Sequence, residues 1–299
     1  MHEVPVLLIA FNRPKVFCGL VEALRCIKPR NIYASFDGPR NALDAELVAM
    51  SINCLERIDW PCRLEIRPSP HNLGCRRGVQ AALKWFFASC DEGIVLEDDV
   101  RPSKDFFYFA HAMLDAYRNN PQVAMINGSN RVPVGNQGKN EAVRLSRYSH
   151  IWGWATWRDT WTMYEKFVGS QRVSPSLLRL MKVLDYRLLE SLYWHRSFRY
   201  AASGRIDTWD LQLQAMLFYQ GMLAVSPREN LVDNVGFDSS ATHTHSQPRH
   251  MQKRTSLLVD PVEALPAGRD VVADEWEGNH VVPGSIWEVF ARLRDHILL

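Results

Sequence analysis

Three adjacent acids, Glu97, Asp98 and Asp99, are the residues whose spacing most strongly suggests chemistry. They directly follow the apolar run 94–96 and precede an aromatic-rich segment with helical spacing. Neighbouring carboxylates repel one another, so a cation or buried donors between them must offset the cost. Magnesium and manganese bind one or two protein carboxylates and complete their shell with water and phosphate. The triplet therefore predicts a metal–diphosphate site, with a helix cap or a solvated turn as the alternative.

The elements that must position these acids alternate between strand and helix over the first hundred residues. Strand patterns cover 5–11, 31–38, 62–69 and 92–99, and helical patterns cover 16–27, 42–58 and 74–89. This alternation predicts an α/β fold with a mainly parallel central sheet and helices on both faces. Such sheets bind ligands at the carboxyl ends of their strands. We therefore expect one crevice to contain Asn12, Arg13, Asp37, Asp98 and Asp99.

After Asp99 the alternation breaks down. The patterns predict a helix over 104–120, a strand over 123–130, a tryptophan-rich segment, helices over 174–199 and 204–221, and a strand-like stretch over 223–237. Patterning is weak from Ser246 until an amphipathic helix over 285–299. The expected organisation is one domain over 1–245, followed by a C-terminal basic segment and amphipathic helix over 246–299.

The composition and net charge of the chain exclude several classes of protein. It has 299 residues, of which 46% are apolar and 23% charged, so it can bury a large core. The net charge of +2 is small and the basic residues are scattered, which argues against nucleic acid as a partner. The N-terminus has no basic leader, and no run reaches the ~20 apolar residues of a membrane span. We expect a cytoplasmic protein whose six cysteines are reduced, mostly packed thiols, with a metal or disulfide site as the alternative.

The segment "VLEDDVRPSKDFFYF", residues 95–109, resembles the metal-binding segment of glycosyltransferases with the GT-A fold, above all N-acetylglucosaminyltransferase I and its relatives. The strand "PVLLIAFNRP" and the "SFDG" at 35–38 look like that family's nucleotide-binding strands. "WGWATWRDTW", residues 152–161, looks like a bacterial branch of such enzymes. The resemblance covers about residues 4–245 and rests on the order of these motifs.

The resemblance implies a GT-A fold and a metal-dependent transferase of a hexose or N-acetylhexosamine. It would use Mn²⁺ or Mg²⁺ and move the sugar, with inversion, from a nucleoside diphosphate, expected to be UDP. The acceptor would be a hydroxyl of a glycan, a lipid-linked molecule or a protein, in bacterial polysaccharide or glycoconjugate synthesis.

By resemblance, Asp99 ligates the metal, while Glu97 and Asp98 face the ribose and the water around the metal. Asp37 would accept a hydrogen bond from the base, although an aspartate before Gly38 also suits a turn. Two further groups would contact the nucleotide or its diphosphate: Phe11, Asn12 and Arg13 after the first strand, and Asn72, Arg76 and Arg77 at a helix start.

Inversion requires a general base that takes the proton from the acceptor hydroxyl. The segment "GRIDTWDLQLQ" offers Asp210, which we favour, and Asp207. Their spacing also suits the N-cap and N3 positions of a helix, so a capping pair is the structural alternative.

The tryptophan-rich segment suggests a second contact surface. A glycine between two indoles suits a loop close to a ligand, so Trp152, Gly153 and Trp154 are expected to line the sugar pocket. Trp157 and Trp161 are expected in the core. By resemblance, His243 could join the metal. The basic run 248–254 could close over phosphates or rest peripherally on the acidic inner face of the cell membrane.

Two rival functions remain. A sugar nucleotidyltransferase would share the sheet and the metal, but it normally carries a Gly-rich, basic loop that "AFNRPKVFCGL" lacks. A non-catalytic sugar- or nucleotide-binding module could keep the acids and the tryptophans.

Overall fold

The computed structural model describes residues 3–139, 142–170, 174–237, 252–257 and 265–281. The first hundred residues form the predicted alternation of strands and helices. Each predicted element is present, and short 3-10 helices η1 and η2 extend the first two helices. The bounds are β1 Val6–Ala10, α1 Pro14–Ala23, η1 Leu24–Cys26, β2 Asn31–Phe36, α2 Ala42–Asn53, η2 Cys54–Arg57, β3 Arg63–Pro68, α3 Gly74–Phe87 and β4 Glu92–Glu97.

The remaining described residues complete the sheet and add a helical layer. Their elements are β5 Val100–Pro102, α4 Lys104–Tyr117, β6 Val123–Asn127, η3 Val134–Asn136, β7 Val143–Ser146, β8 Trp154–Trp157, α5 Arg158–Gly169, α6 Leu177–Val183, α7 Leu188–Ala202, α8 Asp210–Gln220, β9 Leu223–Pro227, β10 Val232–Asn234 and α9 Val271–Val281. Sequence patterns predicted α4, β6, α8 and β9 but not β5, β7 or α9. The helix predicted over 285–299 lies outside the described residues.

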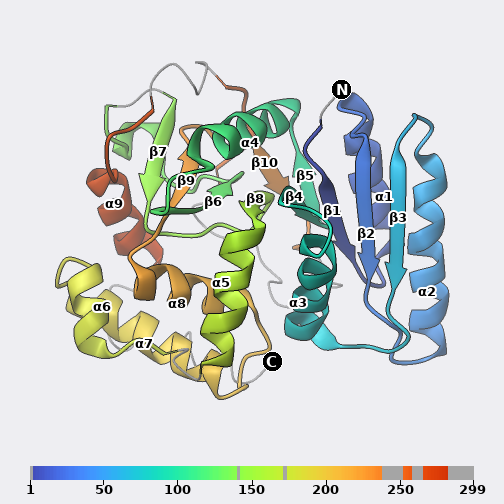
Figure 1. Ribbon diagram of the computed structural model, residues 1–299. Coiled ribbons are helices and arrows are strands. Elements are labelled where there is room, and N and C mark those ends of the chain that lie inside the picture. Colours follow the sequence, from blue (N-terminus) through green and yellow to red (C-terminus); the bar gives the residue numbers. More distant parts are fainter. Residues whose placement is uncertain (1–2, 140–141, 171–173, 238–251, 258–264, 282–299) are drawn as a thin grey trace.

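Eight strands form one mixed, mostly parallel sheet in the order β3-β2-β1-β4-β8-β6-β9-β7 (Figure 1). The strands β3, β2, β1 and β4 are parallel, and β8 runs antiparallel to both β4 and β6. The strand β9 is parallel to β6, and β7 is antiparallel to β9. A separate antiparallel ribbon pairs β10 with β5. The predicted α/β class and mainly parallel sheet are therefore confirmed.

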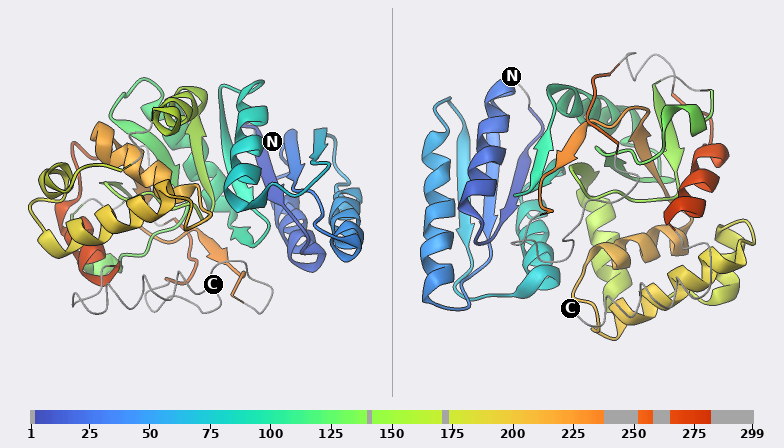
Figure 2. Two further views of the ribbon diagram at one scale, coloured as in Figure 1. Left: turned by 90° about the horizontal axis from the view of Figure 1, so that it is seen from below. Right: turned by 180° about the vertical axis from the view of Figure 1, so that it is seen from behind.

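Alternate residues of the central strands feed two cores, one on each face of the sheet. On β1, Val6 and Leu8 join the core that contains α1 and α4, whereas Leu7 joins the core that contains α3 and α8. This two-residue period is that of a strand buried on both faces. Figure 2 shows the helices lying on both sides of the sheet. The carboxyl ends of β1, β2 and β3 lie together at one edge (Figure 1).

The cysteine prediction was wrong for one pair. Cys18 on α1 and Cys54 on η2 form a disulfide, with their Cα atoms 5.1 Å apart. These residues are 36 positions apart and meet because α1 packs against η2, so local spacing could not reveal the pair. Cys26, Cys62, Cys75 and Cys90 are free thiols. Among the described helices, none has the length and apolarity needed to cross a membrane.

Candidate functional site

A cavity of about 890 Å³ opens at the carboxyl ends of β1, β2 and β4. We call it the donor cavity. Its walls come from these strand ends, from the start of α3 and from residues 204–207, which precede α8. The predicted site residues that line it are Phe11, Asn12, Arg13, Asp37, Asn72, Glu97, Asp98 and Asp207. The crevice expected from the sequence is therefore present for all its members except Asp99, which lies at its border and is not among the lining residues.

Arg13 supplies much of the positive charge that the adjacent acids require. Its Nε donates to Asp98 Oδ2 at 3.1 Å, its Nη2 donates to the other carboxylate oxygen of Asp98, and Nη2 also lies 3.0 Å from Asp99 Oδ2. Arg13 is the N-cap residue of α1, and Pro14 begins the helix immediately after it. Arg101 on β5 adds a hydrogen bond to the carbonyl oxygen of Asp98 at 2.9 Å. Arg13 and Arg101 therefore supply some of the hydrogen-bond donors that the adjacent acids require.

Asp99 is held between the main sheet and the β5–β10 ribbon. Asn234 Nδ2 donates to Asp99 Oδ1 at 3.3 Å, and the backbone passes so closely that a Cβ on Gly236 would lie 2.1 Å from Asp99 Oδ2. The Asp99 side chain keeps 18% of its surface exposed. Sequence reasoning missed both Asn234 and Gly236, because they reach Asp99 only through the long-range pairing of β10 with β5.

Burial and mutual repulsion raise the proton affinity of the acids. Burial, together with the negative charges of Asp99, Asp98 and Asp210, raises the pKa of Glu97 to about 8. Burial also raises the pKa of Asp98, and the Arg13 guanidinium opposes that effect. The raised pKa favours the protonated form of Glu97, and a protonated carboxyl can donate a hydrogen bond to a ligand. This acid-rich cluster, Arg13 with Glu97, Asp98 and Asp99, retains an excess of carboxyl groups next to the cavity.

Asp37 lines the donor cavity and also organises its loop. Its carboxylate accepts hydrogen bonds from the backbone N–H groups of Gly38 at 2.8 Å, Leu73 at 2.8 Å and Gly74 at 3.1 Å, and from Asn72 Nδ2 at 2.9 Å. A Cβ on Gly38 would lie 2.3 Å from the backbone of His71, which explains the glycine. The turn role that we named as the alternative is therefore present, and contact of Asp37 with a base stays a prediction.

Arginines that the sequence analysis did not single out add positive charge to the donor cavity. They come from three separate segments: Arg40, Arg67 and Arg205. The guanidinium of Arg40 lies 5.1 Å from the centre of the Phe11 ring, and Asn12 is anchored by donating to Asp44 Oδ1 at 2.6 Å. Arg40 and Arg67 lie near the ends of β2 and β3, so their proximity to strand ends was the signal that could have found them.

The two arginines predicted at the start of α3 differ in position. Arg76 Nε lies 3.9 Å from Asp207 Oδ1, and Arg76 Nη1 donates to the carbonyl oxygen of Ala201 at 3.4 Å. Arg76 therefore ties α3 to the segment that carries Asp207. Arg77 is exposed, and neither Arg76 nor Arg77 is among the residues that line the cavity.

The two candidate bases are not a capping pair. The N-cap of α8 is Trp209 and no side chain caps it, because the helix begins at Asp210 rather than just after Asp207. Asp207 lines the donor cavity and has 52% of its side chain exposed. Asp210 is less exposed and accepts a hydrogen bond from the Thr208 hydroxyl. Its charge nevertheless contributes to the raised pKa of Glu97, so it lies near the acid-rich cluster.

The tryptophan loop is less accessible than the sequence analysis expected. Trp154 is only 1% exposed and stacks on Trp209 with ring centroids 5.3 Å apart, so it supports the start of α8 from within the core. Gly153 has φ +61°, and a Cβ there would lie 3.0 Å from Val232. Trp152 packs edge-on against Phe237, and Arg131 lies over its ring. The predicted burial of Trp157 and Trp161 is confirmed.

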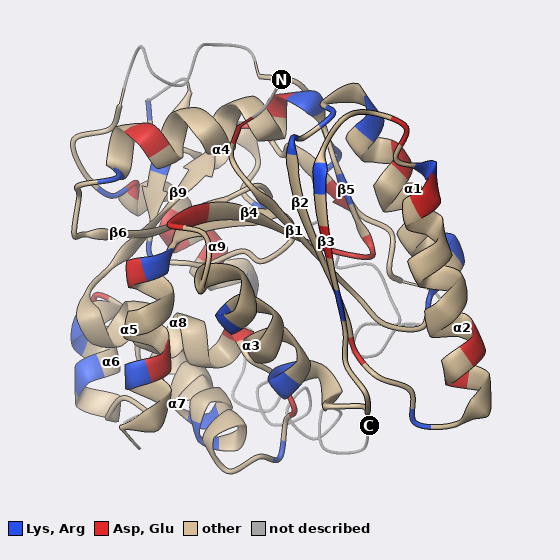
Figure 3. Ribbon diagram, turned by 45° about the vertical axis from the view of Figure 1, so that its right-hand side comes forward, with Lys and Arg blue, Asp and Glu red and all other residues tan. Residues whose placement is uncertain are grey.

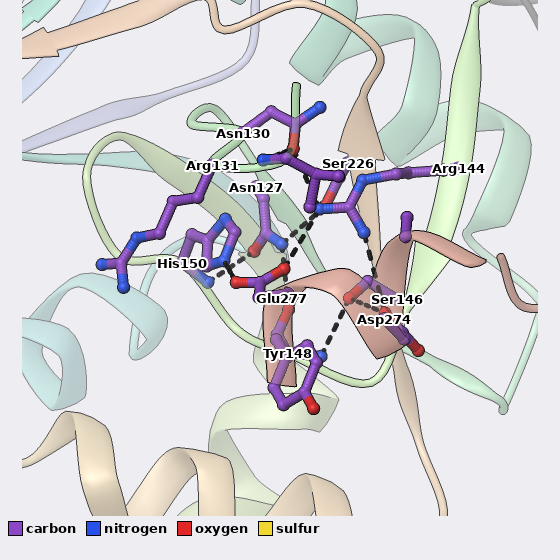
Figure 4. A network of polar contacts seen from close by, with 12 residues as sticks. Asn127, Asn130, Arg131, Arg144, Ser146, Tyr148, His150, Ser226, Asp274 and Glu277 are labelled. Carbon is purple, nitrogen blue, oxygen red and sulfur yellow. Dashed lines mark hydrogen bonds and ion pairs between the residues drawn. The ribbon is translucent and has the colours of Figure 1, made fainter. Parts of the chain in front are cut away.

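A second concentration of charge lies beneath α9 (Figure 4), and none of its charged residues lines the donor cavity. This α9 cluster pairs Arg144, Arg147 and His150 with Asp274 and Glu277, and each of these side chains is at most 3% exposed. His150 Nε2 lies 2.5 Å from Glu277 Oε1, and Nδ1 lies 3.0 Å from the carbonyl oxygen of Ser129. Both ring nitrogens of His150 therefore lie within hydrogen-bonding distance of an oxygen atom.

The described residues contain no group of three or more His, Cys, Asp or Glu side chains arranged to hold a metal ion. A protein-only cage is therefore absent from this part of the chain. His243 lies outside the described residues. No protein-family model matches the chain, and no curated protein is significantly similar to it.

Proposed function

We propose that the chain is a GT-A-type, metal-dependent glycosyltransferase that moves a sugar from a nucleoside diphosphate, UDP in the first instance, to an acceptor hydroxyl with inversion. The observation that carries the proposal is the donor cavity, where the acid-rich cluster, several arginines and Asp207 meet at the carboxyl ends of parallel strands. Its volume is that of a small-molecule or cofactor site. Ligands of open α/β sheets bind at this edge.

The charges of the cavity suit a nucleoside diphosphate. Guanidinium groups bind phosphate through paired N–H donors, and Arg67 and Arg205 line the cavity. Arg40 lines it too, but its Nε and Nη2 already donate to Asp44 at 2.6 Å and 3.2 Å. Glu97 lines the same cavity, and in its protonated form it could donate to a ribose or phosphate oxygen. The apolar Phe11 and Val79 in the same lining provide surface for a base or a sugar ring.

The residues present fit one divalent cation held through Asp99. Each of its carboxylate oxygens accepts one hydrogen bond, from Arg13 or Asn234, and each retains a second acceptor position. Since Asp99 alone cannot complete a shell, the diphosphate and water would supply the other ligands, as is usual for magnesium. When bound, the cation would stabilise the charge on the departing diphosphate.

Asp207 becomes the stronger candidate for the general base. A base must come within hydrogen-bonding distance of the acceptor hydroxyl, and Asp207 is the candidate that is exposed to the cavity. Arg76 Nε lies 3.9 Å from Asp207 Oδ1, close enough to orient the carboxylate. Asp210, bonded to Thr208 and close to Glu97, is better placed to set the charge of the acid-rich cluster.

The test is hydrolysis and transfer from a panel of UDP- and GDP-sugars with manganese, in the wild type, Asp207→Asn and Asp210→Asn. We expect Asp207→Asn to lower turnover by about 100- to 10,000-fold while donor affinity, measured by calorimetry, hardly changes. The same loss in Asp210→Asn alone would transfer the role of base to Asp210. Nucleotide binding without turnover would support the non-catalytic module, and formation of pyrophosphate from a nucleoside triphosphate and a sugar phosphate would support the nucleotidyltransferase.

A further inference from the structure

A second cavity, of about 760 Å³, adjoins the donor cavity. Arg205 lines both cavities, so they meet at this residue, two positions before Asp207. The rest of its lining comes mainly from α7 and its C-terminal turn, and Ser174 comes from the segment before α6. Figure 2 shows α6 and α7, in yellow, together at the margin of the molecule.

One face of α7 lines this cavity. Leu189, Leu192, Arg196, Arg199 and Ser203 recur every three or four residues, which places them on one side of the helix. Leu189 and Arg199 are ten residues apart, which is roughly 15 Å along a helix. The wall therefore changes from apolar at the start of α7 to basic where it approaches the donor cavity.

The basic end carries several cationic groups around one aromatic ring. The guanidinium carbons of Arg196 and Arg205 lie 5.0 Å and 5.3 Å from the centre of the Tyr200 ring. Arg199 and His195 line the same cavity, whereas the described residues of its lining include no carboxylate. Basic residues along α7 are visible in Figure 3. The guanidinium groups of Arg199 and Arg205 in this lining repel each other, and an anionic ligand would relieve that repulsion.

We propose that this second cavity binds the phosphate group of the acceptor substrate, a phosphate ester whose organic part extends toward Leu189 and Leu192. The assignment of this ligand as the acceptor rests on the glycosyltransferase function proposed above. The phosphate would lie among Arg199, Arg205 and Tyr200. From there, a second ester substituent of the same phosphate, which carries the acceptor hydroxyl, could reach past Arg205 into the donor cavity, next to Asp207.

The test is calorimetric titration of the full chain, saturated with UDP and manganese so that the donor cavity is filled. The probes are decyl phosphate, inorganic phosphate and the neutral decyl glucoside, each below its micellar concentration. We expect decyl phosphate to bind and Arg199→Gln to weaken its binding by about tenfold or more. Lys182→Gln, an exposed cation on α6 outside the cavity lining, is the matched control and should leave binding unchanged.

A second variant keeps the test decisive if Arg199→Gln does not fold. Ala202 is exposed and lines the cavity, so Ala202→Glu should add a negative charge and also abolish binding of decyl phosphate. Inorganic phosphate that binds as tightly as decyl phosphate would support the site and point to a soluble sugar phosphate. Tighter binding of decyl phosphate would support the site and point to a lipid phosphate.

Two results would overturn the proposal: unchanged affinity for decyl phosphate in a folded Arg199→Gln or Ala202→Glu variant, or decyl glucoside that binds as tightly as decyl phosphate. The proposed function fails separately. If binding of decyl phosphate depends on Arg199 but no sugar nucleotide is turned over, the phosphate site stands and the transferase function does not.

Discussion

The acid-rich cluster and the α9 cluster both contain a buried or partly buried glutamate, and the two glutamates behave in opposite ways. The pKa of Glu97 is raised to about 8, because burial and three nearby carboxylates disfavour its charge. Burial also acts on Glu277, yet His150, Arg144 and Arg131 lower its pKa to about 2. Burial alone would raise both values, so the charges of the neighbours decide the direction.

The difference separates a structural charge cluster from a candidate ligand site. In the α9 cluster the two acids are balanced by His150, Arg144 and Arg147, and the cluster does not line either cavity described above. In the acid-rich cluster, Arg13 contacts two of three acids and the cavity lies alongside. A perturbed acid in a cleft, without a balancing partner for each charge, is the pattern expected of a functional site.

The largest effect that would test this contrast is loss of Glu277. Glu277→Ala leaves His150 and Arg144 buried without one of their partners, so we expect the free energy of unfolding to fall by about 3–5 kcal/mol. Because the folded pKa of Glu277 lies below its unfolded value, this contribution is present above about pH 4.5 and is lost as the pH falls through about 2. Urea unfolding at pH 7 and at pH 3 measures both effects.

The matched control is Glu275→Ala, an exposed glutamate on the same helix, which should change stability by less than about 0.5 kcal/mol. If Glu277→Ala is no more destabilising than Glu275→Ala, the α9 cluster does not hold the helix and the contrast with the acid-rich cluster disappears.

The α9 cluster also explains why part of the fold was not predictable. The strand β7 reads "VRLS" and is buried on both faces, with Val143 and Leu145 on one face and Arg144 and Ser146 on the other. The helix α9 packs with Asp274 and Glu277 buried, so it lacks the apolar stripe that identifies a helix. The buried polar side chains of β7 and α9 find their partners only when the two elements pack together. The apolar strands β1, β2 and β4 needed no such partner and were predicted.

The candidate site was predictable where it depends on strand ends and not where it depends on long-range packing. Asn12, Asp37 and Asp98 follow buried strands, and parallel topology brings such ends together. Which arginines face the cavity depends on loop paths that no local pattern encodes. Trp154 was misplaced for a similar reason: the sequence shows two indoles around a glycine, but not that Trp209 covers one of them.

A smaller effect, opposite in sign, is expected at Glu97. The folded pKa of Glu97 lies above its unfolded value, so the wild type loses stability as the pH rises from about 4.5 to about 8. Glu97→Gln cannot ionise and should be more stable than the wild type, by on the order of 2 kcal/mol at pH 8 and by almost nothing at pH 4.5. Thermal or urea unfolding across this range gives the difference, with the exposed Glu46→Gln as control. A pH-independent difference would show that Glu97 is not strained by its neighbours.

Replacement of Asp99 is expected to change stability least. It should affect nucleotide binding far more than stability. Asp99→Asn weakens the contact with Arg13 but removes one of the negative charges of the acid-rich cluster, so the two effects oppose each other. We expect the free energy of unfolding without metal to change by less than about 1 kcal/mol, in either direction. Manganese-dependent binding of UDP should nevertheless fall to the level seen with a chelator, because Asp99 is the proposed metal ligand.

Asp91→Asn, at the exposed position just before β4, is the matched control and should retain manganese-dependent binding. If Asp99→Asn unfolds the protein while manganese has no effect on the wild type, the acid-rich cluster is as structural as the α9 cluster.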